Sequence, residues 1–316
     1  STQPITTVGF QPDLVWIKNR DTTSVGTIHD TINGAGYYVI PSATNGLSTL
    51  QTDVFTSFDS NGFTVGTSSA TNGNTNDIVA WCWKAGGTKV SAGGTNLTNR
   101  FVSANPSAGF SIMTYTGNTS DGTIEHGLNA KPELWMFKNL SVSKSWFVLT
   151  NVIDGSVDFG HLEQNVAFNN AGQGDATTTI LNVNNDGGSG LLNANGNNYV
   201  AYAFHSVDGY QKVGSYTGVS GDIEVETGFR PRFIMIKNSS GTGNWEVHDS
   251  VRHSTINTEN GLSKRLRWND NSDEAPFNNT PVFFRDTGFT LDSSVTENTY
   301  IDYDKNGDTF IYLAIA

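Results

Sequence analysis

The chain contains one sequence pattern three times, and this repetition constrains its fold more than any other feature does. In each copy a proline and one polar residue precede four apolar residues, which Lys-Asn follows. This pattern occupies residues 12–19, 132–139 and 231–238. A second, apolar element closes each copy and occupies residues 78–83, 199–204 and 310–315. Because self-similarity at this spacing indicates repeated structural units, we predict three copies of one fold.

The distance between the two elements supports this interpretation. Val79 lies 61 positions after Lys18, and Val200 lies 62 positions after Lys138. The first two copies therefore have cores of equal length to within one residue.

The copies define a domain organisation. We predict a first domain at residues 1–87, a linker at 88–108, a second domain at 109–205 and a third domain at 206–316, in which residues 250–281 form an enlarged loop. The linker is assigned because this stretch is rich in Gly, Ser, Thr and Asn, which is typical of flexible connections.

The first domain lacks an element that opens the other two. A Tyr-Thr-Gly strand at residues 115–117 and 216–218 has no counterpart before the first pattern. A sandwich that lacks a strand exposes unpaired backbone groups and invites strand addition. We therefore expect an upstream segment or a neighbouring chain to fill this edge.

The apolar runs predict the fold class. They are short, rich in Val, Ile, Phe, Tyr and Trp, and bounded by Asn-Gly, Asp-Gly and Gly-Gly pairs, which is typical of strands. Charged residues are 15% of the chain, below the roughly 25% usual for soluble proteins. No window carries a helical stripe of apolar residues. We predict an all-β protein of three tandem antiparallel β-sandwich domains, jelly-roll or lectin-like, with almost no helix.

Charge and cysteine content exclude several classes. The net charge of −12 repels a phosphate backbone, so we predict no nucleic-acid partner. No apolar run is long enough for a membrane span, so we predict no membrane insertion. The single cysteine, Cys82, has no disulfide partner in the chain, and its place between Trp81 and Trp83 suits a small buried residue.

Three longer sequence segments, at residues 8–20, 79–87 and 204–218, resemble segments of the triple-repeat proteins that are encoded among the virion genes of marine tailed bacteriophages such as cyanophages and pelagiphages. The resemblance covers essentially the whole chain. It implies a non-enzymatic structural protein on the virion surface, as a tail fibre, spike or capsid-associated appendage. The implied partners are other virion proteins, a host-surface glycan and further copies of the chain in a homo-oligomer. The alternatives are a secreted carbohydrate-binding module or adhesin and, less favoured, a polysaccharide-degrading enzyme.

No catalytic constellation emerges from the sequence, so we predict no catalytic residues. The pair His29-Asp30 recurs as His248-Asp249, but no nucleophile accompanies either pair. A hydrogen bond at a strand end explains both pairs. Trp146 and Trp245, which occupy equivalent positions in two copies, are predicted to lie in the core.

The enlarged loop of the third domain is the candidate receptor site. Ile311 lies 74 positions after Lys237, twelve more than the corresponding span in the second copy. Basic and aromatic side chains on a loop can hold an anionic glycan through charge-assisted hydrogen bonds and stacking. The candidate residues are Arg252, His253, Lys264, Arg265 and Trp268. A solvated loop, a subunit contact, or a core position for Trp268 are the alternatives.

A second candidate site precedes the last strand. Oxygen-bearing side chains alternate there as at the start of a calcium-binding loop, with a glycine at the turn. The candidate ligands are Asp302, Asp304, Asn306 and Asp308. The acid expected at position twelve is replaced by Leu313, and a hairpin turn explains the segment without metal. Calcium is the one cofactor that the sequence suggests.

Overall fold

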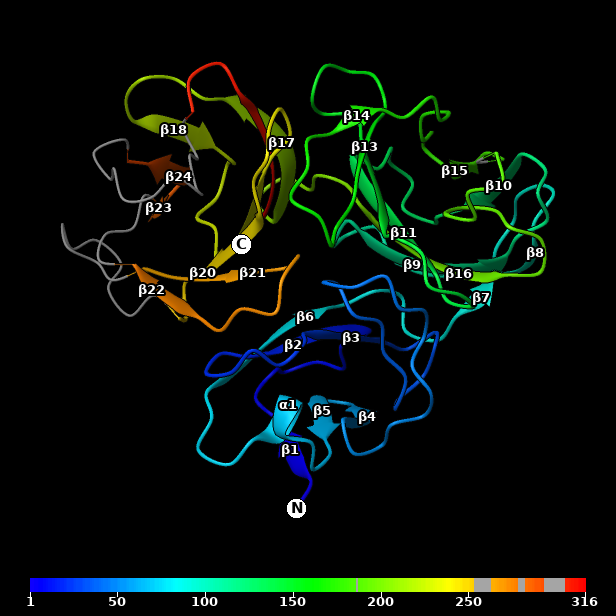
Figure 1. Cartoon of the computed structure of the whole chain (residues 1–316), viewed down its shortest axis with the longest axis horizontal. Coiled ribbons are helices and arrows are strands. Elements are labelled where there is room, and N and C mark those ends of the chain that lie inside the picture. Colours follow the sequence, from blue (N-terminus) through cyan, green and yellow to red (C-terminus); the bar gives the residue numbers. More distant parts are fainter. Residues whose placement is uncertain (186, 253–262, 278–281, 293–304) are drawn as a thin grey trace.

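The computed structural model describes residues 1–185, 187–252, 263–277, 282–292 and 305–316. Their strands, β1 to β25, pair antiparallel throughout, and the one helix among them is the single turn α1 (Ser69–Asn72), as Figure 1 shows. The prediction of an all-β antiparallel fold with almost no helix is therefore confirmed. No described helix is both long and apolar enough to cross a membrane.

Repeat 1 consists of two three-stranded sheets. We call the sheet of order β3-β2-β6 its large sheet, because it corresponds to the large sheets of the other repeats, and the sheet of order β1-β5-β4 its small sheet. Its strands are β1 (Gln3–Ile5), β2 (Leu14–Asn19), β3 (Thr27–Asp30), β4 (Phe55–Asp59), β5 (Gly62–Val65) and β6 (Ile78–Trp83). The repeated pattern forms β2, and the closing element forms β6 beside it.

Repeat 2 has a large sheet of order β14-β13-β12-β11-β16-β9-β8-β7 and a small sheet of order β10-β15. Its strands are β7 (Val90–Ser91), β8 (Thr98–Asn105), β9 (Phe110–Thr116), β10 (Gly122–Glu125), β11 (Leu134–Asn139), β12 (Phe147–Thr150), β13 (Asp158–Gly160), β14 (Asn169–Asn170), β15 (Ile180–Val183) and β16 (Asn198–Phe204). Strands β11 and β16 occupy the places of β2 and β6.

Repeat 3 has a large sheet of order β17-β25-β19-β20-β21-β22 and a small sheet of order β18-β24-β23. Its strands are β17 (Gln211–Thr217), β18 (Ile223–Glu226), β19 (Phe233–Asn238), β20 (Trp245–Asp249), β21 (Ser263–Arg267), β22 (Ala275–Phe277), β23 (Val282–Arg285), β24 (Gly288–Leu291) and β25 (Thr309–Ile315). Here β19 and β25 correspond to β2 and β6.

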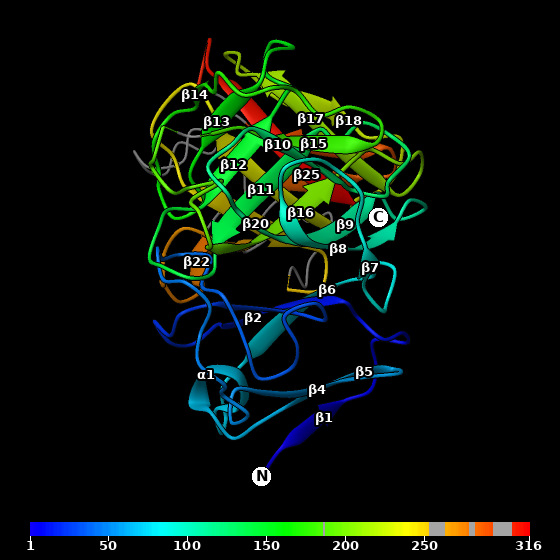
Figure 2. The same ribbon diagram turned by 90° about the vertical axis from the view of Figure 1, so that its right-hand side faces the viewer.

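The three repeats share one hydrophobic core. Side chains from the large sheets of all three meet in a single buried cluster, among them Trp16, Met136 and Met235 from the three pattern strands. The three repeats lie around this cluster and not in a line (Figures 1 and 2). The prediction of three tandem sandwich domains stays a prediction, and the large sheet of each repeat buries its inner face against the large sheets of the other two.

Each pattern strand is buried on both faces, which explains its unbroken apolar run. On β2, Leu14 and Trp16 point into the shared cluster, whereas Val15 and Ile17 pack against the small sheet of repeat 1. Alternate residues of β11 and β19 divide in the same way between the shared cluster and their own repeat.

The stretch predicted as a linker, residues 88–108, is ordered β structure. It contains β7 and β8, and β8 pairs with β9 at the edge of the large sheet of repeat 2. Sheet edges are stabilised by backbone hydrogen bonds and need few apolar side chains, so a polar composition is compatible with strands here.

Candidate functional site

The residues predicted to bind a receptor are mostly interior. The side chain of Arg252 is 2% exposed, Trp268 is 4% exposed, and Arg265 is also buried. A surface role for these three is therefore corrected. His253 lies outside the described residues, and for Lys264 the structure gives only its position on β21.

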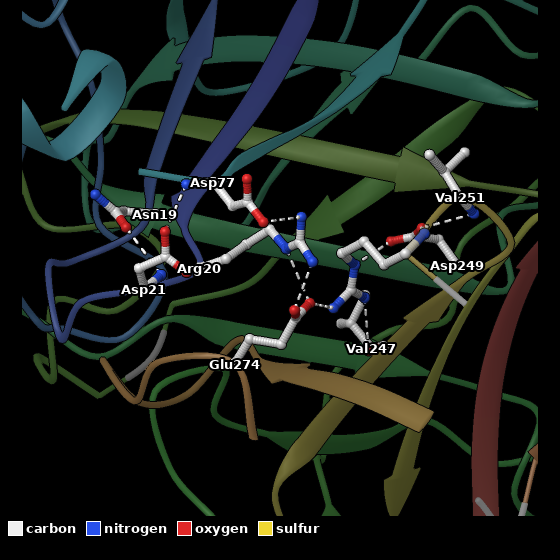
Figure 3. Close-up of polar contacts among 9 residues, drawn as sticks. Asn19, Arg20, Asp21, Asp77, Val247, Asp249, Val251 and Glu274 are labelled. Atoms are coloured by element: carbon white, nitrogen blue, oxygen red, sulfur yellow. Dashed lines mark hydrogen bonds and ion pairs between the residues drawn. The ribbon is translucent and has the colours of Figure 1, made fainter. Parts of the chain in front are cut away.

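Arg252 forms a buried ion cluster at the junction of repeats 1 and 3. Its partners Asp249, Glu274 and Val247 are labelled in Figure 3. Its Nε donates to Asp249, its Nη1 donates to Glu274 Oε1 at 2.8 Å, and its Nη2 donates to the carbonyl of Val247 at 3.1 Å. Its guanidinium lies 5.3 Å from the ring of Trp81, which belongs to repeat 1. The indole Nε1 of Trp81 also donates to Asp249, at 3.2 Å.

Glu274 joins this cluster to a second arginine. Arg20 of repeat 1 donates to both oxygens of Glu274, at 3.0 Å and 2.6 Å. Burial alone would raise the pKa of Glu274, but hydrogen bonds and charge from Arg20 and Arg252 outweigh burial and lower it. We call Arg20, Trp81, Asp249, Arg252 and Glu274 the clasp, because they connect repeats 1 and 3.

Two other arginines of the loop are also neutralised internally. Arg265 and Arg267 lie 3.6 Å and 3.2 Å from the same oxygen of Glu246, and Arg267 also pairs with Asp270 at 3.0 Å. Burial raises the pKa of Glu246, and the two arginines oppose that rise. The concentration of basic residues in an acidic protein is thus explained, for these arginines, by internal ion pairs.

The repeated Lys-Asn has a structural role that the sequence did not reveal. Lys18, Lys138 and Lys237 are all buried, and their ammonium groups donate to main-chain carbonyls; Lys18 Nζ reaches Asn19 at 2.7 Å and Thr22 at 3.0 Å. Burial lowers the pKa of Lys18 and of Lys138 to about 8 and that of Lys237 to about 7. The signal that could have indicated this role is a lysine recurring at the end of an otherwise apolar strand.

The His-Asp pair of repeat 1 is structural, as predicted. The ring nitrogens of His29 contact the carbonyl of Tyr37 and the hydroxyl of Thr27, both at 3.0 Å. Burial lowers the pKa of His29 to about 3, so the ring is neutral. Asp30 accepts a hydrogen bond at 2.9 Å from Tyr202 of repeat 2 and so joins two repeats instead of polarising the histidine.

Trp146 and Trp245 are fully buried, which confirms the core prediction. Each also crosses a repeat boundary. Trp146 Nε1 donates to the carbonyl of Ile40 in repeat 1 at 2.9 Å, and Trp245 Nε1 donates to that of His161 in repeat 2 at 3.0 Å.

The calcium site stays a prediction. Asp302 and Asp304 lie outside the described residues, and Asn306 is exposed. Asp308 accepts hydrogen bonds from Asn238 at 2.8 Å and pairs with Lys305 at 3.1 Å. Within the described part of the chain, no three acidic, histidine or cysteine side chains form a metal-binding group.

Two of the surface grooves formed by described residues border repeat 1. The larger, of about 630 Å³, lies between the two sheets of repeat 1, and its walls include Ile17, Phe63 and Cys82. The smaller, of about 270 Å³, lies between repeats 1 and 2 and is lined by residues that include Lys89 and Phe101.

A protein-family model matches the whole chain. The family described as "Domain of unknown function (DUF7483)" matches residues 1–316. No curated protein and no solved structure matches the chain.

Proposed function

Because the chain belongs to the DUF7483 family, whose description names no activity, we propose its function from its own residues: a non-enzymatic structural protein of a bacteriophage virion. In this proposal it is a surface appendage, such as a tail fibre or a capsid-associated protein, and it mediates host-surface binding or particle assembly. Its partners are other virion proteins, further copies of the chain and a host-surface glycan.

The observation that carries the proposal is the shared core. Three sheets bury their inner faces against one another, and the clasp adds one ion pair, Arg20–Glu274, across one of the junctions. A body whose parts cannot separate without exposing this core suits a load-bearing component of a particle. The likeness of the repeats to virion proteins of marine phages supports the same function by analogy.

A secreted carbohydrate-binding module is the second candidate. The smaller groove places Phe101 beside Lys89, Asn33, Asn99 and Asn198. An aromatic face together with amide groups is a lining that suits a sugar ring. In a virion, the same groove would be the place to look for a host glycan.

Mass spectrometry of purified particles tests the proposal. We expect peptides from all three repeats in particles banded on a density gradient, at a constant ratio to the major capsid protein. Host cells that lack the phage and secrete the protein in soluble form, with none in particles, would favour the carbohydrate-binding module instead.

A further inference from the structure

The outer edge of β6, in repeat 1, has no partner strand among the described residues. In repeats 2 and 3 the opening strands β9 and β17 pair along β16 and β25. The equivalent strand β6 pairs with β2 on one side, and no described strand pairs with its other side. Such an edge presents backbone N–H and C=O groups in position to pair with a further strand.

The side chains of β6 reflect the same difference. On β16, the residues that face the small sheet of their repeat, Tyr199, Ala201 and Ala203, are fully buried. Their equivalents on β6 are only partly buried, and they are Ile78, Ala80 and Cys82. All three line the 630 Å³ groove.

The groove has apolar walls on both sheets of repeat 1. Its apolar lining includes Ile17 on β2, Phe63 and Val65 on β5, and Ile5 on β1. These side chains belong to the core of repeat 1, so the groove opens directly onto that core. The lining also includes polar side chains, among them Gln3, Asn72 and Asn76. A cleft with apolar positions beside a free strand edge is the arrangement that binds an extended peptide by β-augmentation.

The complete repeats show what fills this place. Tyr115 of β9 lies opposite Tyr199, and the two rings stack at 5.0 Å. Tyr216 of β17 lies opposite Phe310 and stacks on it at 5.0 Å. The equivalent of Tyr199 and Phe310 in repeat 1 is Ile78, which lines the groove.

We propose that the groove beside β6 binds one β-strand of another polypeptide chain, which adds antiparallel to β6 and completes the large sheet of repeat 1. In the register of repeat 2, a tyrosine lies opposite Ile78, an apolar residue opposite Ala80 and a small residue opposite Cys82. The opening strands of repeats 2 and 3 are already paired in their own sheets, so neither is free to fill it. The inference rests on the proposed function, because a particle component must join its neighbours.

A peptide with the sequence of residues 109–121 tests the proposal on the full 316-residue chain. We expect saturable binding by fluorescence anisotropy and a rise in melting temperature that increases with peptide concentration. A control peptide with aspartate in place of Met113 and Tyr115 should bind at least about tenfold more weakly, because it loses the two buried anchors.

Matched protein variants locate the binding. Ala80→Arg places a long charged side chain in the groove and should weaken peptide binding at least about tenfold. Thr56→Arg, at an exposed position on β4 that does not line the groove, adds the same charge to the same repeat and should leave binding unchanged. Absence of binding, or equal binding to the Ala80→Arg variant and the unaltered chain, would overturn the proposal.

The source of the strand is tested separately. The carbonyl of Ser1 accepts a hydrogen bond at 2.9 Å from Asn72, which lines the groove, so the same sequence fused ahead of Ser1 can also reach it. If the fused strand stabilises the protein and the free peptide does not bind, a strand from another chain is the wrong occupant. Peptide binding is measured on the isolated protein and does not depend on the particle. Failure of the peptide to bind would contradict the strand-binding proposal, whereas absence of the protein from virions would contradict the proposed function.

Discussion

Replacement of Arg252 by leucine tests how much this residue of the clasp stabilises the protein. The side chain is 2% exposed, and its two carboxylate partners, Asp249 and Glu274, are each 7% exposed. Leucine fills part of the volume but leaves Asp249 buried without its cation. Glu274 keeps its pair with Arg20.

The expected cost follows from these contacts. Removing one partner of a buried ion pair destabilises a protein by about 3–5 kcal/mol. Because Arg20 still neutralises Glu274, the lower end applies, and loss of the contact with Trp81 adds about 1 kcal/mol. A total of roughly 4 kcal/mol is a large part of the ~5–15 kcal/mol that stabilises a typical domain.

Urea unfolding followed by tryptophan fluorescence measures this cost. The folded-state pKa of Glu274 is lowered from its ordinary value of 4.5, so its stabilising contribution is present above that value and is lost as the pH falls through the folded pKa. The difference between the variant and the unaltered chain should therefore be largest near pH 7 and should narrow below about pH 4.

Arg230→Leu is the matched control. Arg230 pairs with Asp286, whose side chain is 92% exposed, so the same substitution there should cost no more than about 1 kcal/mol. If Arg252→Leu lowers the free energy of unfolding no more than Arg230→Leu does, the buried contacts of Arg252 do not stabilise the protein.

Three further substitutions probe other buried contacts. Lys237→Met removes a lysine whose pKa is lowered by burial from 10.5 to about 7. The energetic penalty of burying this group grows as the pH falls from 10.5 to 7, so melting curves at pH 7 and 10 should show a smaller pH dependence in the variant than in the unaltered chain. Tyr202→Phe removes the hydroxyl that donates to Asp30 and should cost about 1–3 kcal/mol in urea unfolding, with no change expected if that bond is absent in solution. Trp146→Phe removes the donor to the carbonyl of Ile40 and leaves a cavity, so it should cost about 2–4 kcal/mol, and a loss below 1 kcal/mol would count against the bond across the repeats.

The sequence predicted the strands well because their signals are local. The run Leu14–Ile17 is apolar at every position, and the structure buries both faces of that strand. The equivalence of Trp146 and Trp245 likewise identified two core residues correctly. These inferences need only periodicity and alignment between copies, and both can be read from the chain itself.

The shared core could not be predicted in the same way. Trp16 faces the other repeats and Val15 faces its own small sheet, yet both are apolar. Nothing in an alternation of apolar residues tells which face meets a neighbouring repeat. Composition misled at residues 88–108 for a related reason, because backbone hydrogen bonds at a sheet edge leave little trace in side-chain polarity.

The candidate receptor residues show why the burial of charged side chains could not be predicted from the sequence. Arg252 is a surface residue on the usual expectation for arginine, and only its partners make its burial tolerable. Arg20 lies 254 positions from Glu274 in the sequence. No local pattern connects residues so far apart, so the ion cluster could be found only from the fold.

The groove and the clasp are neighbours through two pairs of consecutive residues. On β6, Ala80 lines the groove, while Trp81 points to the opposite face and contacts Arg252 and Asp249. In repeat 3, Val251 lines the groove and Arg252 lies in the clasp. A strand that pairs along β6 would fix the backbone that carries Trp81, and the side chain of Val251, which is 87% exposed, gives it a contact with repeat 3. The free edge of repeat 1 and its junction with repeat 3 therefore share the strand β6. A partner strand that orders the backbone of β6 on the groove side would also order the position of Trp81 in the clasp.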